Sequence, residues 1–88
     1  MYTITTSENV KADFFILRKG ENAGKPVKKE TPNSFKVVVN QEVLNPEYFF
    51  YVVKNAFNTG QFKRELIGGA IKFLTIKGAK AGIKNSTM

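Results

Sequence analysis

The chain contains no cysteine and no histidine. Without them it has no disulfides, no thiolate nucleophile, no zinc site built from cysteine and histidine, and no catalytic triad or proton relay based on histidine. A chain free of cysteine also suits a reducing cytosol. These absences exclude several catalytic classes before any pattern is considered.

Acidic side chains are also scarce, seven against fourteen lysines and arginines. They stand singly and form no D-x-D or E-x-x-E pair that would serve a metal ion or acid–base catalysis. They are Glu8, Asp13, Glu21, Glu30, Glu42, Glu47 and Glu65. We therefore predict that the protein is not an enzyme and has no catalytic residue, no metal site, no cofactor and no small-molecule substrate.

Long apolar runs are missing as well. No window approaches the 18 or so apolar residues of a transmembrane helix. The first eight residues lack the basic and apolar regions of a signal peptide. We expect a soluble, cytoplasmic protein with no membrane partner.

Positive charge is abundant, with a formal net charge of +7 and a pI near 9.8. Residues 11–36 hold seven basic and three acidic side chains, and residues 63–88 hold six and one. Two basic segments suit a phosphate-bearing partner, bound largely through counterion release. The candidate nucleic-acid-binding residues are Lys19, Lys25, Lys28, Lys29, Lys77, Lys80 and Lys84, with Tyr51 for base stacking. The alternative is that the lysines only keep the protein soluble and protect sheet edges.

Apolar and β-branched residues in short runs predict four strands, over residues 2–6, 12–18, 34–40 and 70–77. Between the second and third, residues 19–33 are rich in glycine, proline and lysine, which predicts a long exposed loop. Gly20 and Gly24 superficially suggest a phosphate-binding loop, but Pro26 stands where that motif needs serine or threonine.

One main helix is expected over residues 46–58, because Asn45 and Pro46 form a typical helix start. A short second helix is expected over residues 61–67. The prediction is a single α+β domain over residues 1–78, in which a three- to four-stranded antiparallel sheet is packed by these helices. Residues 79–88 are expected to form a mobile basic tail.

Two segments resemble a group of small proteins from Bacteroidetes and their phages and mobile elements. The first has the pattern KGxNxGKP over residues 19–26 followed by PNxF over residues 32–35, and the second runs over residues 67–76. The group has no assigned activity, so no functional residue follows from the resemblance. It implies phage or mobile-element biology, in a bacterial host cell or a phage particle.

The functional prediction is a small basic accessory protein without catalytic activity that binds nucleic acid. The alternative is a structural or protein-interaction protein, either a phage particle component or an oligomeric inhibitor of a host factor. In that case a protein partner or self-association would bury the exposed aromatic residues and order the loop.

Overall fold

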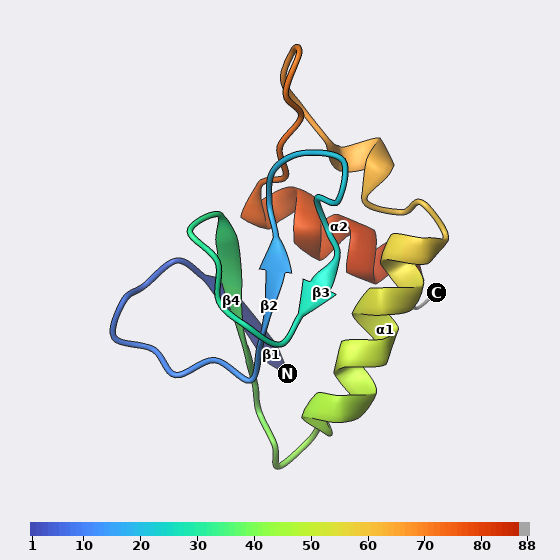
Figure 1. The fold of residues 1–88 in the computed structure, drawn as a ribbon. Coiled ribbons are helices and arrows are strands. Elements are labelled where there is room, and N and C mark those ends of the chain that lie inside the picture. The colour runs from blue at the N-terminus through green and yellow to red at the C-terminus, as the bar shows by residue number, and fades with distance from the viewer. Residues whose placement is uncertain (87–88) are drawn as a thin grey trace.

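A computed structural model describes residues 1–86 of the chain. Four antiparallel strands form one sheet in the spatial order β1-β4-β2-β3, and helices complete the fold (Figure 1). The strands are β1 (Tyr2–Thr5), β2 (Phe14–Leu17), β3 (Pro26–Val27) and β4 (Ser34–Val39). The helices are α1 (Pro46–Asn58), α2 (Ile76–Ser86) and the 3-10 helix η1 (Lys63–Glu65). The predicted α+β class with an antiparallel sheet is confirmed.

The core lies on one face of the sheet. Buried and half-buried residues alternate along β4, because successive side chains of a strand point to opposite faces. The register places Val37 of β4 between Ile4 of β1 and Phe14 of β2, and all three side chains are buried. Both α-helices contribute to this same hydrophobic cluster. In Figure 1, α1 runs along one side of the sheet and α2 passes behind β2 and β3.

Helix α1 begins where its sequence predicts. The Asn45 side-chain oxygen accepts hydrogen bonds from the backbone N–H groups of Glu47 at 2.8 Å and Tyr48 at 3.1 Å. These bonds satisfy two amides that have no partner inside the helix, and Pro46 at the first position has no amide to satisfy. The predicted helix over residues 46–58 is confirmed at both ends.

The ring of Phe62 is enclosed between two glycines from distant parts of the chain. A Cβ atom at Gly24 would lie 2.5 Å from its Cδ2 atom, and a Cβ atom at Gly82 would lie 2.5 Å from its Cδ1 atom. Only glycine leaves room for the ring on both sides. Phe62 therefore joins the loop before β3 to helix α2.

The predicted strand over residues 70–77 is wrong. Gly68, whose φ is +112°, turns the chain back, and residues 67–73 form a narrow hairpin closed by a bridge between Ile67 and Phe73. Helix α2 then begins at Ile76, and the Thr75 hydroxyl oxygen accepts a 2.9 Å bond from the Gly78 amide. The fourth strand is instead β3, inside the predicted loop over residues 19–33.

Two other expected elements also differ. The short helix expected over residues 61–67 is only the single 3-10 turn of η1. Residues 79–86, expected to belong to a tail, lie in α2, where Ala79 and Ile83 are buried. Residues 87–88 of that predicted tail lie outside the described residues.

Replacing Gly82 by alanine should destabilise the protein, although alanine is the better helix former. The added methyl group meets the Phe62 ring, and overpacking costs about 1–3 kcal/mol, which outweighs the gain of about 1 kcal/mol in helix propensity. Urea unfolding measures the change. Gly69→Ala is the control, because nothing lies within 4 Å of its added Cβ atom. A more stable Gly82→Ala variant would contradict the packing described for Phe62.

Candidate nucleic-acid interface

The seven lysines predicted to bind nucleic acid fall into three places. Lys25, Lys28 and Lys29 lie in β3's flanking segments and are here called the β3 lysines. Lys77, Lys80 and Lys84 lie exposed along one helix and are called the α2 lysines. Lys19 follows β2, is exposed, and forms an isolated backbone bridge with Phe73 at the base of the hairpin.

Helix α1 separates the β3 lysines from the α2 lysines. The Lys28 ammonium contacts the ring of Phe50, whereas Lys80 and Lys84 line a groove of about 490 Å³ together with Tyr48. Phe50 follows Tyr48 by two residues, which is about 200° around a helix. The two groups of lysines therefore lie on opposite flanks of α1 and do not form one continuous positive surface.

Two neighbouring aromatic rings on α1 each have a lysine ammonium beside them. The Lys28 Nζ atom lies 4.1 Å from the centroid of the Phe50 ring. That ring meets the Tyr51 ring edge to face at 5.6 Å, and the Lys54 Nζ atom lies 5.9 Å from the Tyr51 centroid. We call Lys28, Phe50, Tyr51 and Lys54 the cation–aromatic strip. Each cation faces the negative side of a ring, a favourable arrangement.

One ring of the strip packs against the core, and the other is open to solvent. The Phe50 ring meets the Phe14 ring edge to face at 5.2 Å, and Phe14 is buried. Tyr51, in contrast, is 60% exposed. An exposed ring on a rigid helix, with the Lys54 ammonium beside it and Lys28 beside the neighbouring Phe50 ring, can stack on an unpaired base while the cations contact phosphates.

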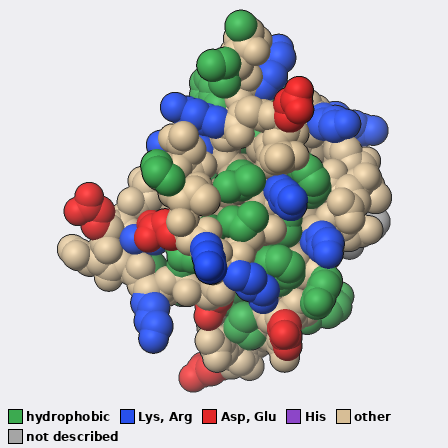
Figure 2. All heavy atoms as spheres, viewed as in Figure 1, with side chains coloured by type: hydrophobic (Ala, Val, Ile, Leu, Met, Phe, Trp, Pro, Cys, Tyr) green, Lys and Arg blue, Asp and Glu red, His purple; other side chains and the backbone are tan. Residues whose placement is uncertain are grey.

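Figure 2 views the molecule from this face. Lysine and arginine side chains gather over β3 and the neighbouring part of α1, around hydrophobic side chains at the centre of the face. Lys25, Lys28 and Lys29 are all exposed, and the ammonium of Lys28 lies over the Phe50 ring. The strip and its neighbouring β3 lysines form one basic and aromatic surface.

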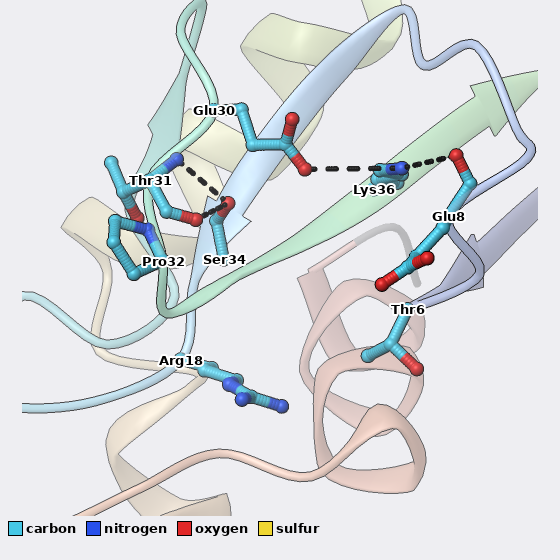
Figure 3. A pocket seen from close by; sticks show the side chains of 8 residues that line it. All are labelled: Thr6, Glu8, Arg18, Glu30, Thr31, Pro32, Ser34 and Lys36. Atoms are coloured by element: carbon cyan, nitrogen blue, oxygen red, sulfur yellow. Dashed lines mark hydrogen bonds and ion pairs between the residues drawn. The ribbon is translucent and has the colours of Figure 1, made fainter.

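Glu30 is the acidic residue nearest to the β3 lysines in sequence, but its carboxylate lies beside a different lysine. Its carboxylate lies 3.8 Å from the Lys36 Nζ atom (Figure 3). The same Nζ atom donates to the backbone oxygens of Ser7 at 2.9 Å and Glu8 at 3.3 Å. Lys36 thus ties the segment after β1 to β4, and it holds Glu30 as its ion-pair partner.

Figure 3 shows the hollow beside the Lys36–Glu30 ion pair. It measures about 430 Å³ and is lined by Lys36, Glu30, Glu8 and Arg18 among others. The Arg18 guanidinium carbon lies 5.6 Å from the centroid of the Phe35 ring, and its Nε atom is buried without a hydrogen-bond partner. Because that atom is closed off from the hollow's solvent, it offers no contact to a ligand there.

No metal site is found within residues 1–86, since no three His, Cys, Asp or Glu side chains there come together. In the same part of the chain, no helix combines the length and apolar character needed to cross a membrane. Burial raises the pKa of the Tyr2 hydroxyl, which lines the groove on the other flank of α1.

Sequence reasoning named Tyr51 and the β3 lysines as candidates but not Phe50 and Lys54, which the structure places beside them. Phe50 lies beside the buried stripe of Phe49 and Val53 rather than within it. A large aromatic residue outside the buried stripe of a helix is the signal from which Phe50 could have been named as a candidate. Lys54 follows Tyr51 by three residues and lies on the same helix face.

The chain matches a family of unknown function, DUF6943, over residues 1–88, and it therefore belongs to that family. No curated protein matches the chain, and no solved structure does.

The arrangement of the strip predicts that removing its two rings lowers the free energy of unfolding by unequal amounts. Tyr51→Ala should change the free energy of unfolding by no more than about 0.5 kcal/mol, because the ring is exposed. Phe50→Ala removes the contacts with Phe14 and Lys28 and should cost about 1–3 kcal/mol, below the value for a fully buried ring. Urea unfolding distinguishes them, and equal costs would contradict the arrangement.

Proposed function

We propose that this member of DUF6943 is a non-catalytic accessory protein that binds single-stranded nucleic acid through β3 and α1. The observation that carries the proposal is the exposed Tyr51 ring, set between the cations of one rigid strip. Base stacking on an aromatic ring contributes about 1–3 kcal/mol per base and tolerates any sequence. A duplex hides the faces of its bases, so the strip favours unpaired strands.

Phosphates would be contacted by the β3 lysines and Lys54. Four such contacts on a single strand give a salt slope of about −2 to −3 in a plot of log K against log salt concentration. Glu30 does not oppose them, since its carboxylate is held by Lys36. The resemblance to proteins of Bacteroidetes phages and mobile elements supports a role in the cytoplasm of a bacterial host, where single strands arise during replication and transfer.

The test of the lysines uses two triple variants with the same change in net charge. Changing the β3 lysines to glutamine should reduce affinity for a fluorescein-labelled 20-nucleotide single strand more than tenfold. The salt slope should become shallower by about 2 units, 0.7 for each lost contact. Changing the α2 lysines to glutamine should leave affinity within about threefold at moderate salt. Equal losses in both variants would show that only net charge matters, and no loss in either would overturn the interface.

The test of stacking uses two neighbouring tyrosines of nearly equal exposure on α1, of which only Tyr51 belongs to the cation–aromatic strip. Tyr51 is 60% exposed and Tyr48 is 63% exposed. Tyr51→Ala should weaken single-strand binding by about 5- to 100-fold without changing the salt slope, because it removes stacking and no charge. Tyr48→Ala should bind as the parent does. If the two variants behave alike, Tyr51 does not stack on bases.

The alternative function, a structural or protein-interaction protein, is supported by a different part of the molecule. Exposed apolar side chains gather on the hairpin that leads into α2. That hairpin lies outside the cation–aromatic strip, and the two surfaces can act independently.

A further inference from the structure

Residues 67–73 are seven consecutive exposed residues, and most of them are apolar or small. The large ones are Ile67, Ile71 and Phe73, which are 48%, 70% and 38% exposed. Figure 1 shows this segment, here called the apolar hairpin, projecting from the end of the domain beyond the sheet. Apolar residues grouped on a projection in this way mark an interaction surface.

The apolar hairpin is rigidly held at its base. Ile67 and Phe73 exchange two backbone hydrogen bonds of 3.0 and 2.9 Å. The Lys72 carbonyl accepts a 2.9 Å bond from the Gly20 amide, and the Leu74 amide donates a 2.7 Å bond to the Arg18 carbonyl. A surface ordered before binding loses little conformational entropy when a partner docks.

A hollow of about 750 Å³ lies beside the projection. Its lining includes the apolar side chains of Leu66, Ala70 and Ile71 and the charged side chains of Lys63, Lys72 and Glu21. The projection and the hollow together present both a convex and a concave apolar element. A protein partner can fill a hollow with a side chain, whereas the flat face of a lipid bilayer cannot.

The charges around this surface are mainly positive. Lys63 and Lys72 border the hollow, and Arg64 is exposed in the same turn of η1 as Lys63. Two copies of the chain would bring these cations together, which disfavours self-association through this surface. An acidic partner would instead meet complementary charge.

We propose that the apolar hairpin and its hollow form a docking surface for a protein partner that presents an apolar side chain flanked by carboxylates. The apolar side chain would enter the hollow against Leu66 and Ile71. The flanking carboxylates would pair with Lys63 and Lys72. Such an arrangement, an apolar anchor within a charged rim, is typical of protein–protein interfaces.

The test is selection of a displayed library of random 12-residue peptides on the full chain. Enriched peptides should carry a large apolar residue with Asp or Glu within two positions of it. Ile71→Ser should weaken a selected peptide at least tenfold, and Lys63→Glu should weaken it while improving binding of the same peptide with its acids changed to lysine. Val43→Ser is the control, because Val43 is likewise exposed, at 60%, but lies before α1, and it should bind as the parent does.

Several results would overturn this proposal. One is the absence of enriched peptides, and others are enrichment without acidic residues or binding that Ile71→Ser leaves unchanged. Sedimentation with phosphatidylserine vesicles that Ile71→Ser abolishes would assign the surface to lipid instead. A concentration-dependent mass that the same variant abolishes would assign it to a second copy. Ile71→Ser should bind single-stranded DNA as the parent does, which separates this proposal from the nucleic-acid interface.

Discussion

The ring of Phe62 between Gly24 and Gly82 is the contact on which the arrangement of the domain depends. It joins three segments that follow one another at long intervals in the chain: the loop before β3, the η1 turn and α2. The Gly24 amide donates to the Leu17 carbonyl and the Leu17 amide donates to the Lys25 carbonyl, so a loop held by Phe62 also holds β3 against β2. The β3 lysines therefore lie on a segment that this packing contact helps to position.

Positive charge and aromatic rings serve different purposes on the two flanks of α1. On the β3 side, Phe50 packs on Phe14. The Tyr51 ring and the ammonium groups of Lys28 and Lys54 lie next to it, toward the solvent. On the other side, the Tyr2 ring packs tilted against the Phe49 ring with centroids 4.6 Å apart, and Lys80 and Lys84 line a largely apolar groove. Net charge alone treats all these lysines as equivalent, but their neighbours differ: the β3 lysines adjoin the cation–aromatic strip, whereas Lys80 and Lys84 line the groove beside Tyr48.

Helix α1 and strand β4 were predictable because their signals are local. Asn45 and Pro46 specify the helix start, and alternate apolar residues specify β4. Helix α2 was not predictable, since Gly78 and Gly82 lower its helix propensity. Only the contacts with Glu65 and Phe62 explain why those positions are small. Likewise, the lysines and Tyr51 could be named as candidates, but their division into two groups follows from the contact of Lys28 with Phe50, which joins residues far apart in the sequence.

Native-state amide hydrogen exchange, measured by NMR, tests most directly whether Phe62 joins α2 and the loop before β3 to one core. If it does, the amides of Gly24 and of Gly82 and Ile83 exchange only through opening reactions about as costly as those of β4, within about 1 kcal/mol. If α2 amides instead exchange at the rate of an unstructured chain while β4 remains protected, the C-terminal segment does not belong to the core. The account of Phe62 would then be wrong.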